Sequence, residues 1–318
     1  MSDGPDFNHF VQHRQLDVYQ QSMARQGYAY GVDLRRSRWL SSSTVGNALV
    51  RAVDRAWPRL ADHLMREVLL DARTAPRGLL RELAAHMNLL RAPLPTVRLL
   101  RPEQRGRWPL VTPLGATRGG ALWLLLDAEA LAAVAADQRA FLLGAGLGHL
   151  HCDHAVFFAA HLLADRREPS LDSRRLAAEL QIKALRSAMA PWTKVMTFSA
   201  DRAGLIACGR LETAVAVIES PPIPVGLGVG HASDSAPSWL PPSPPAAARV
   251  RALEEFARSA VFARVTAMRA RQRELARSVT LLEQPEGEAE PAADLHVPAD
   301  AWSLARVDAR LTARLNLI

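Results

Sequence analysis

The spacing of apolar residues changes along the chain and divides it into regions of different predicted structure. Between residues 13 and 92, apolar positions such as Val45, Leu49, Ala52 and Val53 recur every three or four residues, which predicts helices. From Thr96 the pattern becomes three short apolar runs, TVRLL, WPLVTPL and GALWLLLD, with Arg-Gly-Gly at 118–120 between the last two. These runs predict a small antiparallel sheet that contains a hairpin. Helical periodicity returns at about Ala128.

The last hundred residues alternate between proline-rich or acidic segments and helical patterns. Residues 219–248 are rich in proline, glycine and serine and are expected to form a loop, and an arginine-rich helix is expected over 246–282. The acidic run EQPEGEAEPAAD is poor in apolar residues, which is typical of a flexible linker. We therefore predict a predominantly helical α+β protein with a helical region (1–92), a core (93–282), an acidic linker (283–298) and a C-terminal helix (299–318).

The C-terminal helix is predicted to be amphipathic. Leu304, Val307, Leu311 and Leu315 share one face at helical spacing, while the arginines at 306, 310 and 314 share another. An apolar stripe of this kind needs a surface to cover it. We expect that surface to be protein, either the same chain or a neighbouring copy in a homo-oligomer, and a membrane is not favoured because the stripe is short.

Composition limits the possible functions without selecting one. The net charge is +7 and the isoelectric point is near 10.3, which could favour nucleic acid. However, the arginines are interspersed with acids, and no basic strand carries the aromatic residues of an RNA-binding sheet, so nucleic acid is not the expected partner. The first residues, MSDGPDFNHF, lack an apolar signal segment, and the two cysteines lack a CxxC spacing. A cytoplasmic protein is the expectation.

One apolar segment, AFLLGAGLGHLHCDHAVFFAAHLLA, carries four of the ten histidines. On a straight helix, His149 and Asp153 fall on one side and His151, His154 and His161 on the other. Two explanations stay open. In the first, each histidine is satisfied by a hydrogen bond at the edge of the core, and in the second, His149 and Asp153 form half of a metal site. A phosphate-binding loop is not favoured, because the glycines of GAGLGH do not match the dinucleotide fingerprint.

The stretch DQRAFLLGAGLGHLHCDH and the stretch WTKVMTFSADRAGLIAC together resemble the HtpX-like and CAAX prenyl endopeptidase family of zinc metallopeptidases. The first motif of that family is HExxH, followed five residues later by another histidine. Aligned with GLGH and His154, Ala145 stands at the first zinc histidine, Gly146 at the general-base glutamate and His149 at the second zinc histidine.

The second motif of the family places a glutamate ligand four residues before the aspartate of an Ala-Asp pair. Trp192, Lys194 and Asp201 fit that motif, but Thr197 occupies the glutamate position. Downstream, Ser243, Pro244, Pro245 and Arg249 fit a proline-led segment whose preceding histidine is missing. The resemblance thus implies a zincin-like core that has lost its ligands and its base. It implies further that Asp201, a partner of the ligands in the family, could accept a hydrogen bond from His149.

Zinc-dependent peptide hydrolysis needs several ligands, an open position for water and a carboxylate that takes a proton. Because Ala145, Gly146 and Thr197 supply none of these, the resemblance implies a pseudo-peptidase without cofactor. Such a protein would bind a protein or peptide in the retained groove and along its edge strand. The alternative is a metal-dependent hydrolase with relocated zinc ligands, drawn from His149, Asp153 and His154 with His231 or His296.

Overall fold

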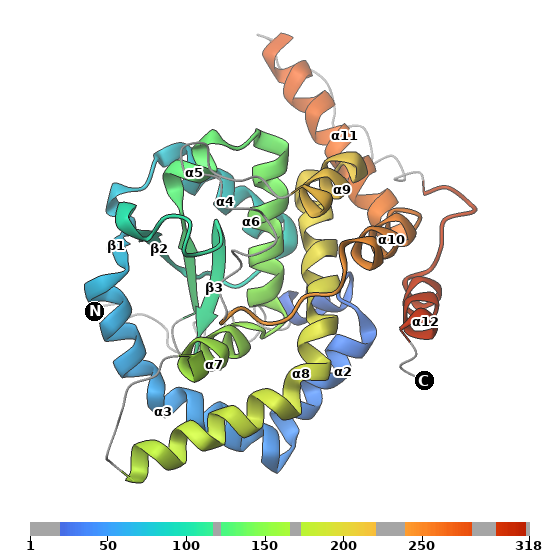
Figure 1. Ribbon diagram of the computed structural model, residues 1–318. Helices are drawn as coiled ribbons and strands as arrows, with labels where there is room; N and C mark the ends of the chain where they lie inside the picture. The colour runs from blue at the N-terminus through green and yellow to red at the C-terminus, as the bar shows by residue number, and fades with distance from the viewer. Residues whose placement is uncertain (1–19, 117–121, 166–172, 221–238, 282–296, 316–318) are drawn as a thin grey trace, which may run out of the picture.

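Four short strands form one mixed sheet, and helices make up most of the remaining described chain (Figure 1). The structure is a computed structural model that describes residues 20–116, 122–165, 173–220, 239–281 and 297–315. The strands are β1 (Leu69–Asp71), β2 (Thr96–Leu100), β3 (Val111–Gly115) and β4 (Leu122–Leu126). The α-helices are α2 (Gly31–Ser42), α3 (Thr44–Glu67), α4 (Arg77–Leu90), α5 (Ala128–Ala133), α6 (Ala136–His151), α7 (Ala155–Asp165), α8 (Ser173–Cys208), α9 (Leu211–Glu219), α10 (Ala246–Ala257), α11 (Ala260–Leu281) and α12 (Leu304–Arg314). The 3-10 helices are η1 (Ala72–Thr74) and η2 (Pro102–Gln104), and residues 20–26 are also helical.

The strand order of the sheet is β1-β2-β4-β3. The predicted hairpin is confirmed, because β3 and β4 pair antiparallel with Val111 opposite Leu126. The prediction of an antiparallel sheet is wrong: β2 runs parallel to β4, with Thr96 opposite Trp123. The chain leaves β2 through η2 and returns as β3 on the far side of β4, so β4 lies between them. Strand β1, which pairs with β2, comes from the region predicted as helical, and residues 1–92 therefore share the sheet with residues 93–282.

Strand β3 forms one edge of the sheet and carries a proline at its centre. The backbone N–H of Asp127 donates to the carbonyl of Leu110 at 3.0 Å, next to the pairing of Val111 with Leu126. Because hydrogen-bonded and non-hydrogen-bonded pairs alternate in an antiparallel ladder, Pro113 occupies a non-hydrogen-bonded position and turns its nitrogen away from β4. Proline is tolerated there, since no ladder bond is lost.

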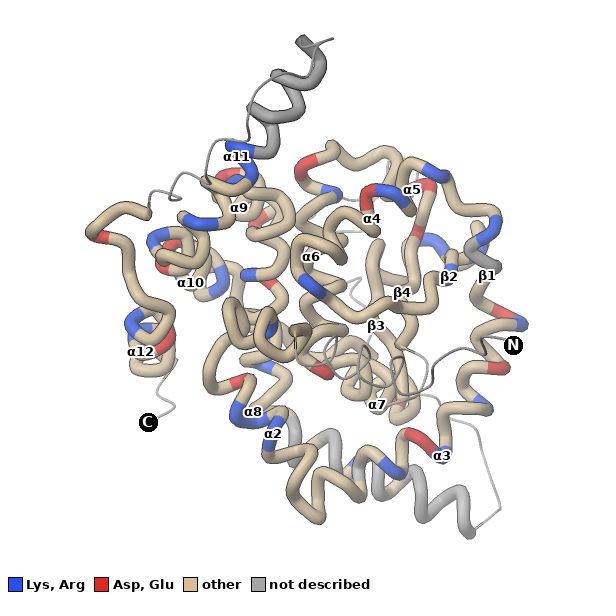
Figure 2. Tube along the Cα trace, turned by 180° about the vertical axis from the view of Figure 1, so that it is seen from behind, with Lys and Arg blue, Asp and Glu red and all other residues tan. Residues whose placement is uncertain are grey.

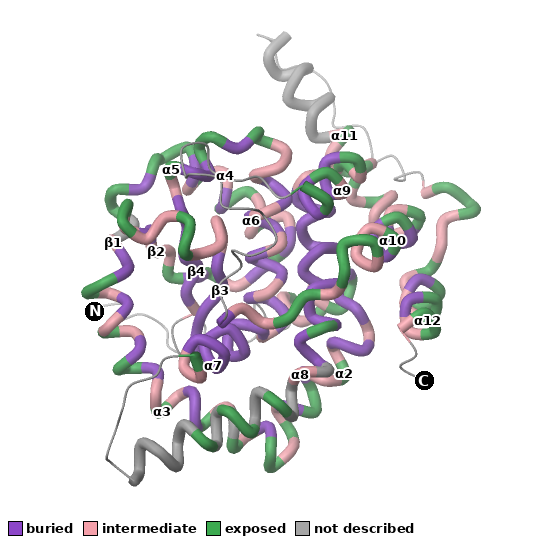
Figure 3. Tube along the Cα trace, in the orientation of Figure 1, coloured by how far each residue is buried: buried purple, intermediate pink, exposed green. Residues whose placement is uncertain are grey.

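Helices α6 and α8 lie side by side in the centre of the molecule and are buried along most of their contact (Figures 1 and 3). Their backbones approach closely because Gly144 and Gly148 of α6 face α8. A methyl group added to Gly144 would overlap the Ala207 side chain, and one added to Gly148 would lie 2.6 Å from the Ala203 Cβ. Each glycine destabilises the helix by about 1 kcal/mol relative to alanine, and the close packing of α6 against α8 offsets this loss.

This packing predicts that Gly148→Ala lowers the free energy of unfolding by about 1–3 kcal/mol, the usual cost of overfilling a close-packed contact. Gly78→Ala in α4 is the matched control, because nothing lies within 4 Å of the position of its added Cβ. The control should be neutral or stabilising by up to about 1 kcal/mol. Urea unfolding of the two variants measures both values, and equal midpoints would contradict the close approach of α6 and α8.

Two of the predicted long helices are interrupted. The histidine-rich segment breaks at residues 152–154 between α6 and α7, and the arginine-rich segment breaks at Arg258–Ser259 between α10 and α11. The C-terminal amphipathic helix is confirmed as α12: the Ser303 side chain caps its first turn, and Val307 and Leu311 are buried. Residues 221–238 of the predicted loop and 282–296 of the predicted linker lie outside the described residues. In the described chain, every helix is too short or too polar to cross a membrane.

Candidate functional site

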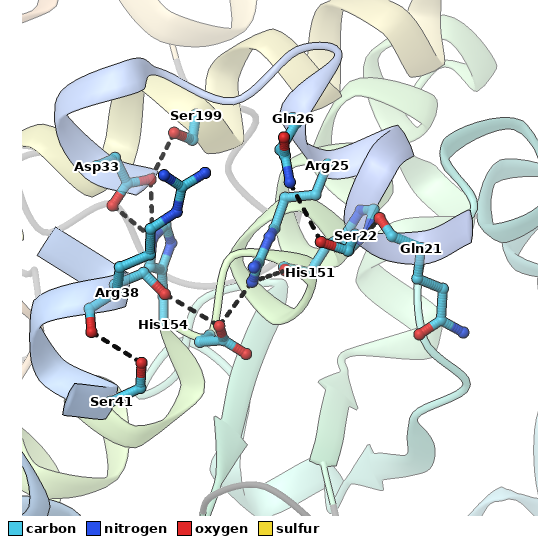
Figure 4. A network of polar contacts seen from close by, with 12 residues as sticks. Gln21, Ser22, Arg25, Gln26, Asp33, Arg38, Ser41, His151, His154 and Ser199 are labelled. Carbon is cyan, nitrogen blue, oxygen red and sulfur yellow. Dashed lines mark hydrogen bonds and ion pairs between the residues drawn. The ribbon is translucent and has the colours of Figure 1, made fainter. Parts of the chain in front are cut away.

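A buried carboxylate, Asp33, organises the polar groups between α2, α7 and α8 (Figure 4). It lies in the first turn of α2, where the helix dipole favours a negative charge. Its oxygens accept hydrogen bonds from His154 Nε2 at 3.0 Å, from Trp192 Nε1 at 2.7 Å and from Ser199 Oγ at 2.5 Å. Burial alone would raise the pKa of Asp33, but the His154 imidazole and these three donors hold the pKa below its ordinary value.

The same contacts continue through His154 to His149. The two Nδ1 atoms lie 3.0 Å apart, so one imidazole donates a hydrogen bond to the other. His149 also packs edge-on against Phe158, with ring centroids 5.0 Å apart. Burial, and next the charge of His154, lower the pKa of His149 well below its ordinary value. Asp33, His154 and His149 therefore form a carboxylate–imidazole–imidazole series, which ends at a partly exposed neutral imidazole.

The turn at residues 152–154 creates this series. Asp153 adopts a left-handed backbone with φ of 63°, and the His154 N–H donates to the carbonyl of His149 at 2.9 Å. The turn brings His154 next to His149, whereas a straight helix would place the two on opposite sides. Asp153 points elsewhere: its carboxylate pairs with Arg25 at 2.6 Å and accepts a hydrogen bond from Ser37 at 3.0 Å. The prediction that His149 and Asp153 share a helix face is therefore wrong.

His151 and Cys152 lie next to this series and are buried. His151 contacts the Tyr28 hydroxyl at 3.0 Å and the carbonyl of Gln21 at 2.8 Å, and burial lowers its pKa to about 4. Burial raises the pKa of the Cys152 thiol well above its ordinary value, and the Asp33 carboxylate adds to that shift. Both groups are therefore neutral near pH 7, and the thiol is a poor nucleophile.

The position aligned with the general-base glutamate has no room for a side chain. Gly146 faces the sheet, and a methyl group added to it would overlap Cγ1 of Val111 in β3 and lie 3.3 Å from Leu124. Ala145 is partly buried one residue away on α6, and Thr197 is buried on α8. These three positions carry neither a carboxylate nor an imidazole. The space beside Gly146 is filled by the Val111 side chain of the edge strand.

Asp201 is paired with Arg249. Its two oxygens accept hydrogen bonds from Nε and Nη2 of Arg249 at 2.8 and 2.7 Å, and Asp201 itself is buried. Burial lowers the pKa of Arg249, but Asp201 outweighs that effect and raises it overall. The charge of Arg249 also contributes to the low pKa of His149, which places the ion pair near that imidazole. Asp201 is thus hydrogen-bonded to Arg249, and His149 is hydrogen-bonded to His154. These bonds replace the expected hydrogen bond between Asp201 and His149.

The structure brings together a different set of possible metal ligands from the one predicted. Ligand atoms of Asp33, Cys152 and His154 all lie within 4.8 Å of one another, and the three residues are buried. A carboxylate, a thiol and an imidazole are donors that zinc accepts. His149 and Asp153 do not belong to this set, while His231 and His296 lie outside the described residues.

Four residues described above, Asp33, Cys152, Ser199 and Tyr28, were not predicted as site residues. The available signal was a charged residue, Asp33, between Val32 and Leu34 at the start of a helix, where burial of a carboxylate requires partners. Trp192 was noted for its place in a motif, but its contact with Asp33 was not.

Comparison with known proteins gave no match to a family model, a curated protein or a solved structure.

Proposed function

We propose that this protein is a catalytically inactive homologue of the HtpX-like and CAAX prenyl endopeptidases that acts by binding a protein or peptide partner. The observation that carries the proposal is the contact between Gly146 and Val111. In the resemblance, residue 146 is the position of the base that activates water, and here the edge strand fills the space beside its backbone. A glutamate side chain cannot enter at residue 146 unless the Val111 side chain moves.

The contacts of His149 and Asp201, the two retained motif residues, support a packing role for both. His149 is the sole imidazole among the three aligned ligand positions, and one imidazole does not hold zinc at useful affinity. Its Nδ1 is hydrogen-bonded to His154, and Asp201 is neutralised by Arg249. The contact of His149 therefore links α6 to the turn before α7, and that of Asp201 links α8 to α10.

A metal-dependent hydrolase with relocated ligands is the second candidate, favoured by the cluster of Asp33, Cys152 and His154. Two features weigh against it. All three residues are at most 2% exposed, so a substrate has no direct access to an ion held there. The Asp33 oxygens already accept hydrogen bonds from three side chains, so the buried charge is satisfied without a metal ion.

The proposal also places the protein in the cytoplasm, which is supported by the free thiols of Cys152 and Cys208. Nucleic acid remains outside the proposal, because basic residues are interspersed with acidic ones along the described trace (Figure 2).

The proposal predicts that the purified protein carries less than about one tenth of an equivalent of zinc and does not cleave an unstructured protein such as casein. Elemental analysis and a fluorescent casein assay with added zinc measure both properties. Stoichiometric zinc, or cleavage that a chelator abolishes, would contradict it. If zinc is found, its loss in Cys152→Ser but not in Cys208→Ser would assign the ion to the buried cluster and support the second candidate.

A further inference from the structure

Helix α12 lies on the body of its own chain through two buried apolar residues, Val307 and Leu311, and through several ionic and hydrogen-bonded contacts. Asp308 accepts a hydrogen bond from the backbone N–H of Gly31 at 2.8 Å, and its other oxygen lies 2.8 Å from Nη1 of Arg202. Thr312 and Tyr30 share a hydrogen bond of 2.8 Å between their hydroxyl groups. The helix thus contacts the first residues of α2 and the buried arginine of α8.

Arg202 makes this surface selective for a helix with an acidic residue at the position of Asp308. Its side chain is 1% exposed and lies between the rings of Tyr30 and Phe256, with 5.6 and 5.0 Å from its Cζ to their centroids. It donates a hydrogen bond to the carbonyl of Tyr28, and in the described part of the chain Asp308 is the carboxylate that pairs with it. A buried guanidinium requires an anion, because an unpaired buried charge is strongly unfavourable.

A second set of contacts pairs arginines of α12 with an acidic residue of α10. Arg310 and Arg314 both pair with Glu255 of α10, which is 7% exposed, the former at 2.9 Å. Trp302, just before the helix, lies beneath the Arg306 guanidinium at 4.3 Å. Figure 2 shows acidic and basic residues of α12 beside α10. The surface therefore recognises one acid at position 308 and two arginines at 310 and 314.

We propose that the surface formed by Gly31, Arg202 and Glu255, called the α12 groove below, is a helix-docking site, and that it also accepts α12 of a second copy of this chain. The two copies would exchange their C-terminal helices reciprocally. This inference does not depend on the proposed function.

Two observations support exchange between copies. The unit to be exchanged is α12 with Trp302, whose backbone is hydrogen-bonded to Arg258 and Ala260. Within α12, Ser303 caps the N-terminus and only Val307 and Leu311 are deeply buried. Residues 282–303 connect α11 to α12, and the fifteen residues 282–296 alone are long enough to span up to about 50 Å. A neighbouring groove is therefore within covalent reach, and it offers the same complementary charges.

The test is a charge exchange between two full-length variants. E255R should repel the arginines of its own tail, and R310E/R314E should repel the groove of its own chain. When the two variants are mixed, each groove complements the tail of the other chain. The expected result is a reciprocal heterodimer with twice the chain mass of 34.8 kDa in multi-angle light scattering. The triple variant E255R/R310E/R314E is the matched control and should behave like the wild type, with its complementary charges restored in one chain.

A folded mixture that keeps the mass of single chains would overturn the proposal. So would a R310E/R314E variant indistinguishable from wild type in melting temperature, since the charges would then not hold the tail. If E255R does not fold, a fluorescent peptide of residues 299–318 replaces it as the probe, titrated into R310E/R314E. The peptide should bind at least about tenfold more tightly than the same peptide carrying D308K, and equal binding of the two peptides would also overturn the proposal.

Discussion

Asp33→Asn is expected to lower the free energy of unfolding by about 3–5 kcal/mol, the range for breaking a buried charged pair. The substitution keeps the shape of the side chain but replaces an acceptor by an amide donor that faces His154, Trp192 and Ser199. At least one of these donors then loses its partner. Chemical unfolding in urea measures the change, which would be one of the largest that a single isosteric substitution can cause in this chain.

Asp153→Asn is the control for Asp33→Asn. Asp153 also has a cationic partner and a hydroxyl donor, Arg25 and Ser37, but its side chain is 40% exposed. Replacing Asp153 should lower the free energy of unfolding by less than about 1 kcal/mol, as for exposed pairs.

The stabilisation that Asp33 provides depends on pH. Because the pKa of Asp33 is lowered, this stabilisation is present above the unfolded pKa of about 3.9 and is lost as the pH falls through the lower folded value. The difference in the free energy of unfolding between wild type and Asp33→Asn should therefore become smaller in acid. Equal losses of stability in Asp33→Asn and Asp153→Asn would show that the Asp33 network is not formed.

A double variant, Ala145→His with Thr197→Glu, is expected to bind zinc at least about 100-fold more tightly than the wild type. The resemblance places these residues at the two lost ligand positions beside His149. Three ligands would then converge, and Gly146 stays unchanged because a side chain there would overlap Val111. Competition with a chromophoric chelator measures the affinity.

The role of His149 separates a restored site from accidental binding in that double variant. Adding His149→Ala should return zinc affinity to the wild-type level, whereas adding His151→Ala should not. If the folded double variant gains no affinity, the alignment of both motifs with the metallopeptidase family is wrong, and the proposed function loses its basis. Peptidase activity is not expected in either case, since the base is still missing.

Local patterns predicted much of the fold. The β3–β4 hairpin and helix α12 followed from the spacing of apolar residues within each element, which is a local signal even where distant residues stabilise the element. Strand β1 was missed, since three residues between two helices carry no period of their own. The parallel pairing of β2 with β4 was also missed, because it depends on how the chain passes around the intervening hairpin.

The candidate site was predictable only in part. Sequence indicated His149 and His154, but the carboxylate that holds them, Asp33, lies 121 residues before His154. Their meeting depends on the left-handed turn at Asp153, for which the sequence offers only the tolerance of aspartate for that conformation. Straight-helix geometry predicted that the two histidines lie on opposite sides, but the turn between α6 and α7 brings them into contact.

Pro113 determines how a partner can approach the sheet. The nitrogen that β3 turns away from β4 at its centre carries no hydrogen, so this edge of the sheet has a carbonyl acceptor without the donor that normally accompanies it. An incoming strand would leave its own central carbonyl unpaired. The edge thus resists the strand-to-strand growth that leads to aggregation, and the proposed peptide partner would have to bind through side-chain contacts instead of through an extended backbone ladder.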